Sequence, residues 1–174
     1  ATGKTYGELS KIGNHLGSID MALQYDFSNI RMMLYRQNLY DVGALGHLAN
    51  IADGINGMSL INKKPASGYA HWHKLLVEFI YTKDQAGAYG KNVKSGDEDY
   101  YNNYEYTDGW VYKGINIGNP LLTSRKFTRN GIITDPYDNI IDNRVMALHT
   151  GIEGSIKQIN LVAKLTYSKN YGTY

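Results

Sequence analysis

Apolar and polar side chains alternate along residues 19 to 36, strictly so in residues 19 to 27, and this alternation predicts two β-strands joined by a tight turn at residues 26 to 29. The apolar positions of the pair are Ile19, Met21, Leu23, Tyr25 and Phe27, followed by Ile30, Met32 and Leu34. A half-buried sheet of a soluble protein shows such a pattern. So does a transmembrane β-barrel, in which the apolar face contacts lipid and the polar face lines a wet lumen.

Four further segments carry the same alternation, over residues 55 to 62, 71 to 83, 144 to 156 and 159 to 168. The predicted inward face of the six strands includes charges of both signs: Asp20, Asp26, Arg31, Lys74, Glu78, Glu153 and Lys164. These residues would line either a pore or a salt-bridged, filled interior. We favour the interior, because mixed signs give no clear ion selectivity and because Leu76, Ile80 and Val162 are bulky.

The predicted connections are short, long, short, long and short in chain order. Outer-membrane barrels join their strands by short turns on one side and longer loops on the other, whereas a soluble β-sandwich has no reason to sort its loops in this way. We therefore predict an all-β fold, an antiparallel transmembrane outer-membrane β-barrel. Residues 1–174 would form a single partial barrel domain, with a long extracellular loop at about 85–142.

The strand count suggests that this barrel is larger than the six strands. Single-chain barrels have about eight strands or more, and an open sheet edge in lipid would leave backbone groups unpaired. We therefore favour a larger barrel whose other strands are absent from this sequence; the alternative is that the segment VYKGINI, residues 111 to 117, supplies a short extra strand.

Composition narrows the function classes. The net charge is +2, from 18 Lys+Arg and 16 Asp+Glu, so a basic nucleic-acid-binding surface is not indicated. The chain has no Cys, which excludes thiol catalysis and disulfides. It has 16 Tyr but only 3 Phe, and Tyr suits both a membrane interface and a sugar-binding surface. The first residues show no signal-peptide core, so we expect a mature chain or a piece of a longer one.

Several stretches resemble the capsule assembly Wzi family, in the form found in Bacteroidetes. In chain order they read MLYRQNLYDVGALGHLANIADGINGMSLIN, LLVEFIYTKDQAG, YYNNYEYTDGWVYKGINIGNPLL and LVAKLTYSKNYGTY. The similarity runs through most of residues 15 to 174 and corresponds to the later part of a longer family member. It implies a large outer-membrane barrel that holds capsular polysaccharide at the bacterial cell surface, without enzyme activity.

The main candidate for ligand binding is an aromatic cluster in the predicted loop. It comprises Tyr100, Tyr101, Asn103, Tyr104, Tyr106, Asp108, Trp110 and Tyr112. Sugar recognition needs flat rings to stack on C–H-rich faces and short polar groups to bond hydroxyls, and this cluster has both. The alternative is a loop that packs on itself, with Tyr at the lipid interface.

Other chemistry has weaker signals. Two of the carboxylates Asp97, Glu98, Asp99, Glu105 and Asp108 could serve a glycosidase, although such clusters are more often solvated charge. His71 and His73 flank Trp72 and would share a strand face, but no third metal ligand is evident. His15, His47 and His149 are isolated in sequence, although alternation puts His149 on the same strand face as Glu153. We expect no catalytic residue, metal or cofactor.

The sequence thus predicts a non-catalytic barrel of the bacterial outer membrane. Its expected partners are surface polysaccharide and outer-membrane lipid, and not nucleic acid. Two alternatives stay open: a structural subunit that binds other outer-membrane proteins, and a diffusion channel.

Overall fold

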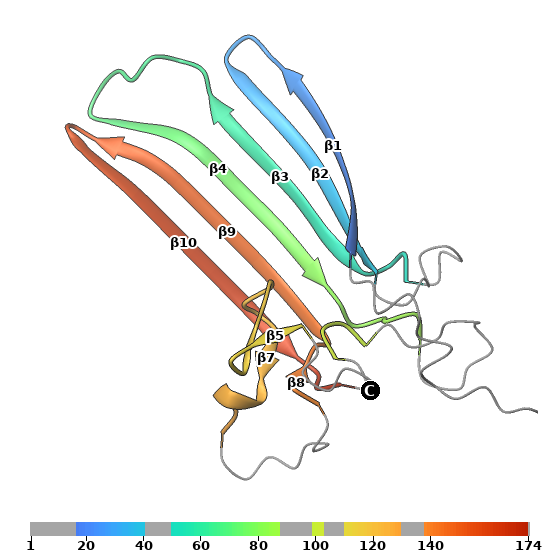
Figure 1. The fold of residues 1–174 in the computed structure, drawn as a ribbon. Coiled ribbons are helices and arrows are strands. Elements are labelled where there is room, and N and C mark those ends of the chain that lie inside the picture. Colours follow the sequence, from blue (N-terminus) through green and yellow to red (C-terminus); the bar gives the residue numbers. More distant parts are fainter. Residues whose placement is uncertain (1–16, 41–49, 88–98, 103–109, 130–137, 174) are drawn as a thin grey trace, which may run out of the picture.

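The computed structural model describes residues 17–40, 50–87, 99–102, 110–129 and 138–173. The regular secondary structure of these residues is almost entirely β-strand, organised around one antiparallel sheet (Figure 1). No helix among the described residues is long and apolar enough to cross a membrane.

Six long strands form the sheet, in the order β1-β2-β3-β4-β9-β10. Their bounds are β1 Gly17–Asp26, β2 Ile30–Tyr40, β3 Gly54–Asn62, β4 Ala70–Tyr81, β9 Val145–Ile156 and β10 Ile159–Asn170. All six predicted strands are therefore confirmed, with ends that differ by a few residues from the expected ones. The predicted antiparallel all-β arrangement is confirmed as well.

Connection lengths also follow the prediction. The turns after β1, β3 and β9 are short, and the connections after β2 and β4 are long. Neighbours in the sheet are neighbours in sequence except for β4 and β9, which pair directly although the long connection, residues 82–144, separates them. The two ends of this connection meet, because the Thr82 N–H donates to the Val145 carbonyl at 2.9 Å.

Small elements lie within the long connection. The strands β5 Val111–Tyr112 and β6 Ile115–Asn116 form a hairpin, which agrees with the short extra strand expected there, although it joins no strand of the main sheet. A second pair consists of β7 Thr123–Ser124 and β8 Ile140–Asp142. The single-turn 3₁₀ helix η2, Arg125–Phe127, follows β7.

The strand register gives the sheet one apolar and one polar face. Residues directly opposite each other in an antiparallel sheet point to the same side. One such row crosses all six strands and contains Leu23, Leu34, Met58, Val77, Thr150 and Leu165. The next row points to the other side and contains Ala22, Tyr35, Gly57, Glu78, His149 and Thr166. We call these two sides the apolar face and the polar face.

Large apolar side chains are exposed across the apolar face. The exposed fraction reaches 72% at Leu165 and 68% at Leu23, and it is 46% even at Leu148 on the inner strand β9. The sheet is open, since β1 and β10 each have one strand neighbour among the described residues. The described part of the chain thus forms a curved sheet rather than a closed barrel.

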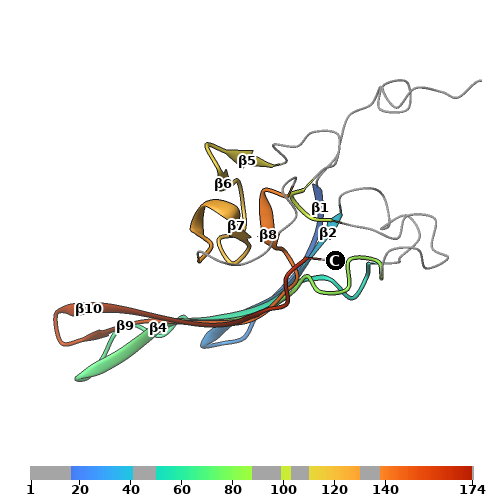
Figure 2. The ribbon, with the colours of Figure 1, turned by 90° about the horizontal axis from the view of Figure 1, so that it is seen from below.

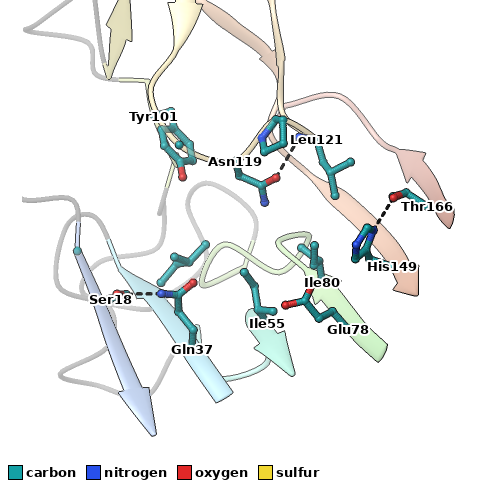
Figure 3. Close-up of a pocket in the computed structure, with 14 residues that line it drawn as sticks. Ser18, Gln37, Ile55, Glu78, Ile80, Tyr101, Asn119, Leu121, His149 and Thr166 are labelled. Carbon is teal, nitrogen blue, oxygen red and sulfur yellow. Dashed lines mark hydrogen bonds between the residues drawn. The ribbon is translucent and has the colours of Figure 1, made fainter. Parts of the chain in front are cut away.

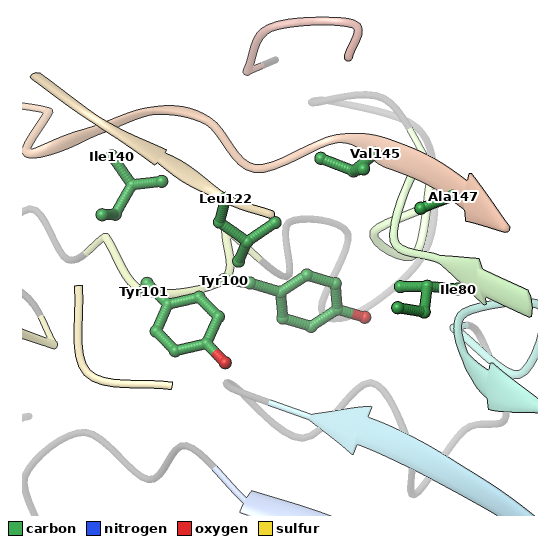
Figure 4. Packing of buried hydrophobic residues seen from close by; sticks show 7 residues of the cluster. All are labelled: Ile80, Tyr100, Tyr101, Leu122, Ile140, Val145 and Ala147. Carbon is green, nitrogen blue, oxygen red and sulfur yellow. The ribbon is translucent and has the colours of Figure 1, made fainter. Parts of the chain in front are cut away.

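The long connection folds back onto one end of the polar face. Figure 2 shows β5 to β8 on one side of the sheet only, toward which the long strands bend. Seven buried residues form the core at this contact (Figure 4), namely Ile80, Tyr100, Tyr101, Leu122, Ile140, Val145 and Ala147. Ile80 and Ala147 come from the polar face, so the core joins the sheet to the connection. The bulky Ile80 side chain, predicted to point inward, therefore packs against residues of the long connection.

Candidate functional site

A cavity of about 590 Å³ lies between the polar face and the long connection (Figure 3). The sheet forms one side of the cavity and the segment from Gly118 to Leu121, together with Tyr101, forms the other. Its lining residues from the sheet are Gly17, Ser18, Gln37, Leu39, Ile55, Glu78, Ile80, His149 and Thr166. The volume falls within the range typical of small-ligand sites.

The strand register brings the polar side chains of the sheet together. Glu78 on β4 is directly opposite His149 on β9, which is opposite Thr166 on β10. The His149 Nδ1 lies 2.6 Å from the Thr166 Oγ1, which fixes the orientation of the imidazole ring. Three side chains from three strands therefore form one polar row along the cavity.

Glu78 is held in place from the other side by Tyr35. The Tyr35 hydroxyl donates to Glu78 Oε1, although β3 lies between their two strands. The bond is possible because Gly57, the β3 residue between them, has no side chain. A Cβ at Gly57 would lie 2.0 Å from Tyr35 Cζ, so only glycine leaves room for the ring there.

The other side of the cavity is built on unusual backbone geometry. Tyr101 has a φ of +72°, in the left-handed region that non-glycine residues rarely adopt. Gly118 has a φ of +142°, and a Cβ there would lie 2.8 Å from the Tyr101 hydroxyl. Asn119 Oδ1 accepts from the Leu121 N–H at 3.0 Å, which closes the turn beside the ring. Burial raises the pKa of the Tyr101 hydroxyl, so this group stays neutral.

A buried carboxylate anchors the long connection beside this site. Asp53, which precedes β3, is fully buried and accepts from the Asp84 and Gln85 N–H groups at 2.9 and 2.7 Å. It also accepts from the Tyr100 hydroxyl at 2.9 Å. Burial raises the pKa of Asp53 to about 6, although the three hydrogen bonds oppose the shift. Asp53 thus ties the start of β3, the exit of β4 and the long connection together.

The predicted ligand-binding residues occupy different environments. Tyr100 is fully buried, so its ring has no face available for a ligand, and Tyr101 is 7% exposed and lines the cavity. Trp110 and Tyr112 are 36% and 65% exposed, at the start of the β5–β6 hairpin. Asn103, Tyr104, Tyr106 and Asp108 lie outside the described residues.

The other candidates do not form a site in the described part of the chain. Of the clustered carboxylates only Asp99 is described, and it accepts from Asn143 Nδ2 at 2.5 Å. The rings of His71 and His73 are 4.9 Å apart, and His73 Nε2 lies 3.1 Å from Ser155 Oγ. Within the described ranges, no group of three or more His, Asp or Glu side chains is arranged to hold a metal ion.

The cavity was not predicted from the sequence. Alternation correctly placed Glu78 and His149 on the polar face, but His149 is isolated in sequence and was given no role. Thr166 lies on the next strand, β10, whereas Gln37 and Glu78 lie on β2 and β4. Knowledge that β4 pairs with β9 would have been the signal that places Glu78 opposite His149.

Comparison with known proteins adds no relative. No protein-family model matches the sequence, and neither a curated protein nor a solved structure shows significant similarity to it.

Proposed function

We propose that the chain is part of the wall of an outer-membrane β-barrel that binds surface polysaccharide without catalysis. The observation that carries the membrane assignment is the two-faced sheet. Its apolar face is exposed across six strands, while its polar face carries the folded connection. Exposed apolar patches of this extent mark a surface that contacts lipid or another protein.

Strand lengths agree with a membrane crossing. The six strands have 9 to 12 residues, and a tilted transmembrane β-strand needs about 9–11. Closure in lipid requires further strands at the free edges of β1 and β10, because unpaired backbone groups there would cost several kcal/mol each. Those strands would come from outside the described residues.

Polysaccharide binding is supported by the exposed aromatic pair. Trp110 and Tyr112 lie on a hairpin that is fixed to the sheet through the buried core, and the Trp110 N–H donates to the Tyr101 carbonyl at 2.9 Å. Rings held on a rigid base can stack on sugar rings with little loss of conformational entropy. Weak contacts repeated along a polymer would add up through multivalency. The resemblance to the Wzi family points to capsular polysaccharide as the ligand.

The two alternative functions, a diffusion channel and a structural subunit, predict different properties. A diffusion channel is disfavoured because the connection packs against Ile80 and Ala147 on the side that would line the pore. A structural subunit would bury Trp110 against a partner protein, and it would copurify with that partner in fixed ratio.

Binding of the host's own surface polysaccharide to the full-length protein in detergent tests the proposal. Trp110→Ala should weaken binding while the protein stays folded. Tyr69→Ala is the matched control, because Tyr69 is 67% exposed but lies in the turn between β3 and β4, at the other end of the sheet. A folded wild-type protein that does not bind the polysaccharide would refute the function.

The membrane assignment has its own test. The chain has no Cys, so single cysteines can carry spin labels without background. A label at Leu165 on the apolar face should be accessible to oxygen dissolved in lipid, and a label at Val162 on the polar face should not. Equal accessibility at the two positions would contradict a lipid-facing apolar side.

A further inference from the structure

We propose that the cavity between the polar face and residues 118–121 is a subsite for an uncharged sugar unit and that it excludes acidic sugars. The inference rests on the proposed polysaccharide binding and assigns to it a second site and a charge class. The cavity lies on the sheet side of the connection, whereas Trp110 and Tyr112 belong to the β5–β6 hairpin.

The two sides of the cavity offer the mixture of surfaces that a sugar ring needs. Leu39, Ile55 and Ile80 give the sheet side an apolar patch that can contact ring C–H groups, and Pro120 and Leu121 do so from the connection. Figure 3 shows Ile55 and Ile80 pointing toward Asn119 and Leu121 across the cavity. Ligand sites of this kind combine an apolar lining with a few placed polar groups.

Three polar side chains at the cavity, Gln37, His149 and Asn119, each keep one atom available. Gln37 donates through Nε2 to Ser18 at 3.3 Å, His149 uses Nδ1, and Asn119 accepts through Oδ1. Among the described residues, the remaining atoms Gln37 Oε1, His149 Nε2 and Asn119 Nδ2 have no hydrogen-bond partner in the protein. They supply an acceptor, a ring nitrogen and a donor, which suits hydroxyl groups that both donate and accept.

Glu78 sets the charge preference. Its Oε1 accepts from Tyr35, and its side chain points into the cavity from β4. No Lys or Arg is among the described residues that line the cavity. A carboxylate or sulfate on the ligand would therefore face a negative group without a fixed cation to offset it, and such like-charge contacts are unfavourable.

The geometry of Tyr101 supports a preformed site. A left-handed backbone is strained at a tyrosine, and such outliers persist where the surrounding structure over-determines them. Here the buried ring packs against Gly118, in the same turn that presents Asn119 and Leu121 to the cavity. The side of the cavity opposite the sheet is thus held in position before any ligand enters.

The test uses oligosaccharides cut from the host's surface polysaccharide and separated into neutral and acidic fractions. Binding of each fraction to the full-length protein would be measured by calorimetry. Leu121→Trp should narrow the cavity and weaken neutral-fragment binding about tenfold or more, whereas Val162→Trp, on the polar face outside the cavity, should change it less than about twofold. The comparison of these two variants can be made without knowing the identity of the sugar.

A second variant tests the charge preference without altering the cavity's shape. Glu78→Gln keeps an acceptor for Tyr35 and removes the negative charge, so the ratio of acidic-fragment to neutral-fragment binding should rise about tenfold. Suppose that Trp110→Ala weakens binding, but Leu121→Trp and Glu78→Gln both bind neutral and acidic fragments like the wild type. The cavity inference is then overturned and the proposed function stands. Preference of the wild type for acidic fragments would also overturn the inference. If the folded wild type binds no fragment or polymer, both proposals fail.

Discussion

The Tyr100 hydroxyl donates a hydrogen bond to the Asp53 carboxylate at 2.9 Å, across 47 positions of sequence. The same hydroxyl accepts from Asn50 Nδ2 at 3.2 Å, and all three side chains are fully buried. One tyrosine thus links the connection between β2 and β3 to the connection between β4 and β9.

Loss of this hydroxyl should loosen the connection. Tyr100→Phe keeps the ring in the core but leaves Asp53 and Asn50 each without one partner, which should cost about 1–3 kcal/mol of stability. Limited proteolysis and chemical denaturation of the purified protein would measure the effect. Tyr112→Phe, at a 65% exposed position, is the control and should be nearly neutral. Equal stability of the two variants would show that the link is unimportant.

Asp53 should make stability depend on pH. Its pKa is about 6 in the folded protein against an ordinary value of 3.8, so the folded state favours the protonated form. The stabilisation is complete below about pH 3.8 and is lost as the pH rises through 6, with a total of about 3 kcal/mol. Denaturation at several pH values, compared with Asp53→Asn, would isolate this contribution. An identical pH slope in the variant would refute it.

Gly57 and Gly151 should respond differently to the same substitution. Gly57→Ala would displace the Tyr35 ring and break its bond to Glu78, and overpacking of this kind costs about 1–3 kcal/mol. A Cβ at Gly151, also on the polar face, would meet its nearest atom at 3.7 Å, in ordinary contact. Gly151→Ala should therefore be tolerated. Thermal unfolding would compare the stabilities of the two variants. Equal stability would contradict the prediction.

A charge on the apolar face should be far more disruptive than one on the polar face. Leu165→Lys would place an ammonium near the middle of the proposed lipid-facing side and should cost about 2–4 kcal/mol in a bilayer. Val162→Lys lies on the same strand but points to the other side, so its effect should be small. Unfolding in lipid vesicles would compare them. A similar cost at both positions would argue against a lipid-facing surface.

The sequence was most informative where a simple period governs the structure. Alternation, strict in the first strand and imperfect in the fourth, predicted all six strands, and the contrast of short and long connections agreed with their order. It also assigned Glu78 and His149 to the polar face, because side-chain direction in a strand follows from position alone.

Prediction was least effective in the long connection, where no period applies. Tyr100 and Tyr101 were grouped with Trp110 because all are aromatic neighbours of polar residues. Aromatic composition does not distinguish a ring that packs in a core from one that faces a ligand. Which rings are buried depends on contacts with Ile80 and Ala147, strand residues that are distant in sequence from Tyr100 and Tyr101.

Because Thr82 and Val145 are hydrogen-bonded to each other, the length of the long connection between them does not affect the pairing of β4 with β9. Its ends are held together by the Thr82 N–H to Val145 carbonyl bond, and also by the Val145 N–H, which donates to the Thr82 hydroxyl at 3.0 Å. The entropy of closing a loop rises slowly with length, by about 0.6 kcal/mol per doubling. The segment between these residues could therefore be exchanged or lengthened while the sheet keeps its strands and register.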